Sequence, residues 1–283
     1  MFVLRPFLSL LIASVATALG LGIALSAADR RASGIASLRP DSSADALVLV
    51  GVLLLAIAAA SLALHWLGIF IVGAIHLVLG GLAVLVPTGG ILSGAYSPVY
   101  EVTGMLTGID RNLGAGAAIF YFSGVALVLG ALLVAAALAV RSRLEAPPTR
   151  RPNAIVASVV GALALVGSVI VLVVVGDEFV TLLFSRFQYE VTLALGIAGA
   201  ALLAGVGGLT LRWSSRGGIV VGAALLAAGL IAFVGWSWLP REVGGLLIVT
   251  HGLPIIVGVS ILVVSIVAAV SRSAAVPIDA DAL

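Results

Sequence analysis

Three histidines are the side chains best suited to chemistry within the apolar part of this 283-residue sequence. His76 lies in the middle of one long apolar run, and His65 shares a helix face with it if one helix passes through both. His251 is followed by Gly252 and Pro254, a pair that loosens a helix. A buried imidazole can contact a ligand or respond to protonation. We therefore take His76, His251 and His65 as a candidate intramembrane polar site. The alternative is a neutral ring bonded to a neighbouring helix.

A second group of polar side chains lies in segment 96–111. It contains Tyr96, Tyr100, Glu101, Asp110 and Arg111. Tyrosine rings favour the headgroup layer of a membrane, while charged groups stay in water. The pattern predicts an external recognition surface, or else an interfacial segment that only caps the protein. Glu101 and Asp110 could also act as acid and base on a lipid-linked substrate, but two carboxylates in an irregular loop are weak evidence for an enzyme.

The residue types that are missing exclude several kinds of site. The sequence has no cysteine and no lysine, so it contains neither a disulfide, a thiolate metal site nor a phosphate-binding loop lysine. It also lacks H-E-x-x-H and G-x-S-x-G. We therefore predict no catalytic residue, no bound metal and no cofactor. The formal charge of +2 gives no reason to expect a nucleic-acid partner.

The composition indicates that most of the chain lies in a lipid bilayer. Hydrophobic residues make up 62% and charged residues only 9%, against about 25% charged in soluble domains. Apolar runs of about 20 residues match the length of a membrane-spanning helix. We predict an all-α integral membrane protein with about eight transmembrane helices and the lipid bilayer as its surroundings. These spans are expected near 7–27, 46–64, 67–86, 116–140, 154–175, 190–211, 218–238 and 244–270.

Arginines divide the sequence and indicate its orientation. Every basic residue is arginine, which together with abundant Ala, Val, Leu and Gly indicates a GC-rich bacterial genome and hence a bacterial plasma membrane. The densest arginine cluster, in 141–152, predicts a cytoplasmic segment. An even number of spans then places the N- and C-termini in the cytoplasm. The predicted organisation is a first four-helix half at 1–140 with an external loop at 87–115, a cytoplasmic basic linker at 141–152, a second four-helix half at 153–271 and a polar tail at 272–283.

The two predicted halves have the same order of helices and loops. Each begins with a helix and a polar external loop, which is 29–45 in the first half. Two helices joined by a short internal turn follow, then an external connection and a last helix that ends in arginine. Such halves form parallel repeats related by an axis along the membrane normal; shared composition is the other explanation. The first apolar run fits a signal peptide or a first helix, and the repeat favours the helix.

No motif assigns the chain to a family, and three functions remain open. The first is a non-enzymatic accessory or scaffold subunit of the membrane, with another membrane protein as a partner of the external segment. The second is a small-solute or lipid transporter with a site near His76 and His251. The third is a membrane enzyme that acts on a lipid-linked substrate. A core almost free of ionisable side chains favours the first.

Overall fold

A computed structural model describes residues 4–37, 41–86, 98–145, 153–186, 188–234 and 247–273. Within these residues the chain is helical and forms no strand. The elements are α1 (Leu4–Ala36), α2 (Ser42–Ala60), η1 (Ser61–Ala63), α3 (Trp66–Leu85), α5 (Pro98–Ile109), α6 (Arg111–Phe122), α7 (Val125–Glu145), α8 (Ala154–Val171), η2 (Leu172–Gly176), α9 (Asp177–Arg186), α10 (Val191–Thr210), α11 (Arg216–Val234), α13 (Leu247–Thr250) and α14 (Leu253–Ser273).

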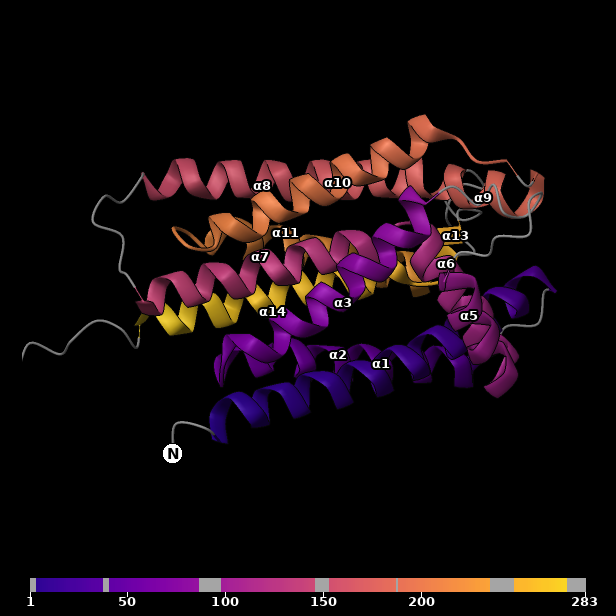
Figure 1. Ribbon diagram of the computed structural model, residues 1–283, viewed down its shortest axis with the longest axis horizontal. Helices are drawn as coiled ribbons and strands as arrows, with labels where there is room; N and C mark the ends of the chain where they lie inside the picture. Colours follow the sequence, from indigo (N-terminus) through magenta and orange to yellow (C-terminus); the bar gives the residue numbers. More distant parts are fainter. Residues whose placement is uncertain are drawn as a thin grey trace, which may run out of the picture.

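The described residues contain eight helices that are long and apolar enough to cross a membrane. This confirms the prediction of an all-α multi-pass membrane protein. The long helices lie side by side, while α5, α6, α9 and α13 gather at one end (Figure 1). The start of α1 and the end of α14 both lie at the opposite end, as an even number of spans requires (Figure 1).

Three segments that we expected to be loops are helical. Helix α1 continues to Ala36 instead of ending before residue 29, and α8 continues through a π-helical turn into α9. Charged side chains at the end of a span do not stop a helix when they have partners or reach water. Segment 98–115, for which the sequence predicts irregular structure, instead forms α5 and the first turn of α6. Pro98 occupies the first residue of α5, where its missing N–H costs nothing.

Helices of the two halves begin at similar separations along the sequence. Helices α1, α2 and α3 begin at residues 4, 42 and 66, and α8, α10 and α11 begin at residues 154, 191 and 216. These starts are 149 or 150 residues apart, and Ser9 and Ser158 are 149 apart. From α7 to α14 the separation is 128 residues, as from Gly130 to Gly258. The connection between α3 and α7 is therefore longer, by the difference of 21 residues, than that between α11 and α14.

Contacts between helices follow the same register. A Cβ added to Gly68 of α3 would overlap the carbonyl oxygen of Ser9, and one added to Gly217 would overlap that of Ser158. In both halves the residue that begins the last long helix follows a glycine in the left-handed region, Gly124 with φ of 83° and Gly252 with φ of 64°. Glycine adopts this conformation without the steric cost that a Cβ imposes. These contacts and backbone breaks occupy equivalent positions in the two halves, and the duplication itself stays a prediction.

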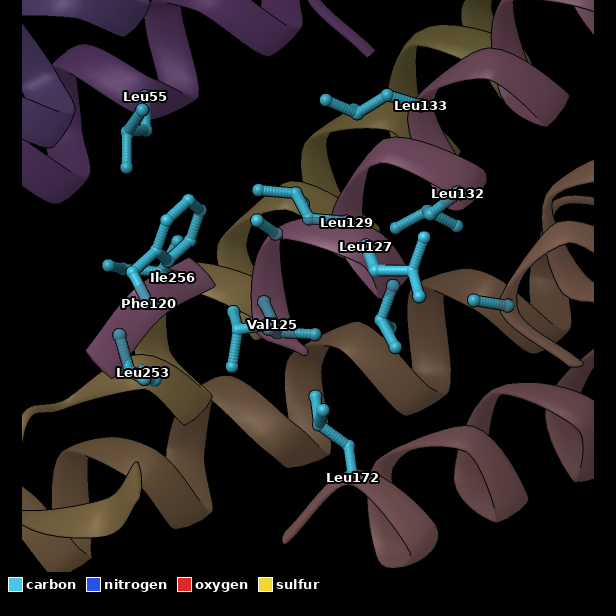
Figure 2. Packing of buried hydrophobic residues seen from close by; sticks show 14 of the residues in the cluster. Leu55, Phe120, Val125, Leu127, Leu129, Leu132, Leu133, Leu172, Leu253 and Ile256 are labelled. Carbon is cyan, nitrogen blue, oxygen red and sulfur yellow. The ribbon is translucent and has the colours of Figure 1, made fainter. Parts of the chain in front are cut away.

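The last helices of the two halves form the centre of the molecule. Helix α7 packs on α3 and also on α10 of the other half, while α14 packs on α11 and on α2. The apolar stretch of α7 is 72% buried and that of α14 is 67% buried, against 33% to 44% in the other six spans. Figure 2 shows part of this buried cluster, with Phe120 of α6 and Val125 of α7 on the side of Leu253 and Ile256 of α14. The outer helices present apolar side chains outward, as lipid contact requires.

Candidate functional site

A cavity of about 340 Å³ lies among α1, α3, α5 and α6. Its lining is mostly apolar, and its polar side chains are Ser14, Thr17, His76 and Tyr121. The complete lining comprises Ser14, Thr17, Ala18, Leu21, Gly22, Leu25, Val72, Ile75, His76, Leu106, Leu113, Ala117, Phe120 and Tyr121. A concave apolar site with a few polar groups is the usual form of a small-molecule site.

His76 lies in the wall of this cavity. Its ring is buried and packs edge-to-face with Phe120, with 5.8 Å between the ring centroids. Its Nδ1 lies 3.5 Å from the Tyr121 hydroxyl oxygen. That distance is at the outer limit of a hydrogen bond. The hydrogen bond between His76 and Tyr121 is therefore weak. A ligand oxygen closer to either group would form a stronger one.

Close packing of α3 on α7 fixes the position of His76. A Cβ added to Gly73 would lie 2.9 Å from the Leu133 Cβ, and one added to Gly80 would overlap the backbone of Leu127. These two glycines flank His76 by three and four residues, as the sequence indicated, and they allow the helix backbones to approach. The histidine ring is thus carried by a rigid helix pair.

The second half of the chain does not reproduce this cavity. In the repeat register Leu225 replaces His76 and Ile248 replaces Phe120. The space that these two residues line, with α8 and α14, has a volume of only about 10 Å³. Leu106 of α5, which lines the larger cavity, comes from the longer connection of the first half. The cavity therefore lies in a part of the first half that has no counterpart of similar volume at the equivalent position of the second half.

His65 is not part of this cavity. Its backbone is extended, with φ of −165° and ψ of 145°, and it caps α3 by accepting a hydrogen bond from the Leu67 N–H at 3.2 Å. Its ring stacks on Trp66 with 5.5 Å between centroids. The chain turns here, so the continuous helix that would place His65 and His76 on one face does not form.

His251 lies in a polar cluster at the end of the bundle that carries α13. Its Nδ1 is 3.3 Å from the Thr250 hydroxyl, and its Nε2 is 3.7 Å from Asp29 of α1. In the same region the Arg31 guanidinium donates to Asp45 at 2.9 Å. Arg31 and Asp45 were predicted to lie in a polar loop, and sequence reasoning missed their pairing. His251 therefore belongs to contacts between the halves.

The predicted external recognition residues have different environments. Tyr100 is half-buried and its ring lies 4.7 Å from that of Phe122. Glu101 and Arg111 are exposed. Asp110 caps α6 by accepting from the Asn112 N–H at 3.0 Å, and it also accepts from the Ser26 hydroxyl of α1. Tyr96 lies outside the described residues. The exposed Glu101 and Arg111 remain available to a partner, whereas Asp110 attaches α6 to α1.

The role of Asp110 predicts a pH-dependent stability. The hydrogen bonds from Ser26 and Asn112 hold the pKa of its carboxyl below the usual value. A group with a lowered folded pKa stabilises the fold above its unfolded pKa, about 3.9, and loses that effect as pH falls through the folded pKa. We expect Asp110→Asn to lower the melting temperature at pH 6 and to matter less at pH 3. Thermal unfolding in a non-ionic detergent measures both, and an equal difference at the two pH values would contradict this role.

No family model, curated protein or solved structure matches this chain. Over the described residues, no three side chains of histidine, aspartate or glutamate gather as metal ligands would.

Proposed function

We propose that this protein is a non-enzymatic membrane protein that binds an uncharged lipid-like molecule in the His76 cavity. The observation that carries the proposal is a 340 Å³ cavity with no charged residue in its lining. An apolar chain would fill the space between α1 and α3, and one oxygen of the ligand would bond with His76 or Tyr121. Long-chain alcohols and quinone rings have this chemistry. A charged ligand would lose its hydration without an opposite charge to replace it.

The surroundings of the cavity agree with an accessory role better than with catalysis. His76 has Tyr121 as its polar neighbour, and the cavity lining contains no carboxylate to orient the imidazole or to share a proton. Acid–base catalysis needs such a second group in reach of the substrate. Exposed Glu101 and Arg111 on the helices that cap the cavity would let a partner membrane protein sense the bound molecule. We place the opposite end, with its arginine cluster, in the cytoplasm of a bacterial cell.

Transport is the second candidate, and the internal repeat is what favours it. Parallel repeats form many transporters, with the substrate site at the repeat interface. Beside His76, the space that reaches Ser260 of the second half has a volume of only about 20 Å³. The larger cavity lies inside the first half. This location fits a bound lipid-like molecule better than alternating access between the halves.

Photo-crosslinking tests the binding site directly. A long-chain alcohol with a diazirine near its hydroxyl is added to the protein in nanodiscs, and labelled peptides are identified by mass spectrometry. We expect labels on α1, α3 or α6, and we expect His76→Leu to weaken binding by about tenfold, since a hydrogen bond in an apolar site contributes about 1 to 2 kcal/mol. Leucine is the residue that the second half has at this position.

His65→Leu is the matched control, because it removes an imidazole from the same helix outside the cavity. Its binding should equal that of the unmodified protein. Unchanged labelling of the His76→Leu variant, with both variants folded, would remove His76 from the site. Flux of the alcohol across proteoliposomes that depends on His76 would favour transport instead.

A further inference from the structure

A second cavity lies at the end of the bundle where α1 begins and α14 ends. It has a volume of about 440 Å³ and lies between the end of α7 and the turn after α10. Its lining comprises Leu138, Ala139, Arg141, Ser142, Leu209, Arg212 and Trp213. Two guanidinium groups and one hydroxyl thus share a cavity with apolar side chains. The His76 cavity, by contrast, has no charged residue in its lining.

Neighbouring groups hold the two arginines of this cavity and Arg143 beside it. The Arg143 guanidinium donates to the carbonyl oxygen of Arg212 at 2.6 Å and to that of Ala268 at 2.7 Å. The first bond holds the turn after α10 against α7, and the second holds α14 against α7. The Arg141 guanidinium lies 4.7 Å from the centre of the Trp66 ring, and that of Arg212 lies 6.0 Å from the Trp213 ring. Contact with aromatic faces restrains the guanidinium planes.

Arg212 also has a buried donor that the protein does not use. Its Nε is shielded from solvent and has no hydrogen-bond partner in the described structure. A buried unsatisfied donor costs about 1 to 3 kcal/mol, and more when it carries charge. Arg212 lines the cavity, so an anionic oxygen there would bond to its guanidinium, and a small rotation of the side chain would bring Nε to the anion. Arginine binds phosphate oxygens especially well because its N–H groups form a planar fork.

We propose that this cavity binds the phosphate of an anionic phospholipid. The shared chemistry is a phosphate-type anion, and the apolar walls favour the lipid as its source. Leu138 and Leu209 are 37% and 45% exposed, so they offer a surface along which acyl chains can lie. Tryptophan is characteristic of the headgroup layer, as at Trp213. Basic cavities between helices at the cytoplasmic side bind such headgroups.

Native mass spectrometry of the purified protein tests the assignment. The protein is exchanged into nanodiscs of phosphatidylcholine with either phosphatidylglycerol or no anionic lipid, then released and weighed with its bound lipids. We expect retained phosphatidylglycerol, about fivefold less with Arg212→Gln or Arg141→Gln, and about 25-fold less with both. A fivefold loss corresponds to about 1 kcal/mol for each arginine near the surface.

Arg216→Gln is the matched control, since Arg216 is exposed at the same end and does not line the cavity. It should retain the lipid, and Arg212→Lys should retain more than Arg212→Gln because charge persists. Equal loss in Arg216→Gln, or equal retention of phosphatidylcholine, would overturn the proposal. Displacement of the lipid by millimolar inorganic phosphate would overturn the lipid as the source. The single variants keep the test valid if the double variant does not fold.

Discussion

Replacement of Arg31 by methionine is expected to lower the free energy of unfolding by about 3 kcal/mol. The Arg31 side chain is buried and joins both halves of the chain. It pairs with Asp45 at 2.9 Å, donates to the Thr250 carbonyl at 2.8 Å, and donates to the Phe233 carbonyl, over whose ring it lies at 3.9 Å. Methionine fills a similar volume, but it has no N–H to donate to the carbonyl oxygens of Thr250 and Phe233.

The partial exposure of Asp45 limits the size of this effect. Its side chain is 46% exposed, so after the replacement its carboxylate is stabilised by water rather than left as a buried charge. Most of the loss therefore comes from the carbonyls and from packing. Lysine at position 31 should recover less than half of the stability, because an ammonium group lacks the planar fork that reaches several acceptors.

Unfolding in mixed micelles with increasing sodium dodecyl sulfate measures this difference. Arg111→Gln is the control, since Arg111 is exposed and belongs to the same end of the bundle. It should change the free energy by less than about 0.5 kcal/mol. If Arg31→Met and Arg111→Gln were equally mild, Arg31 would not join the halves in solution.

The Arg31 contacts also mark the limit of prediction from sequence. Apolar runs gave the eight spans because hydrocarbon thickness sets their length. A prediction from hydropathy assigns charged residues to loops, so the predicted first helix ends before Arg31. The partner that keeps this arginine in a helix, Thr250, lies 219 residues away in the chain. No local pattern contains that information.

The candidate site was predictable only in part for a similar reason. His76 and its flanking glycines are adjacent in sequence, so their shared helix face could be deduced from the helical period. The cavity needs α5 and α6, whose segment carries glycines and charges typical of a loop. Its helices form because Asp110 caps one of them and Ser26 holds that cap to α1. Tertiary contact therefore decided the local structure.

Glycine contacts offer the sharpest test of the internal repeat. Gly130 of α7 and Gly258 of α14 occupy equivalent positions in the register. A Cβ added to Gly130 would lie 2.7 Å from the carbonyl oxygen of Gly73, and one added to Gly258 would lie 2.7 Å from the backbone nitrogen of Leu226. In each case the nearby atom is backbone, which cannot rotate away as a flexible side chain does. The two central helices would have to move from their partners.

We therefore expect Gly130→Ala and Gly258→Ala each to lower the free energy of unfolding by about 3 kcal/mol, the upper part of the range for overpacking. Gly199→Ala is the control, since a Cβ there meets no atom within 4 Å. It should stabilise α10 by about 0.5 to 1 kcal/mol, because alanine favours a helix more than glycine. Unfolding titrations of the three proteins separate the two effects. If Gly258→Ala behaved like Gly199→Ala while Gly130→Ala lost stability, the tight crossing would belong to the first half alone, and the repeat would not extend to packing.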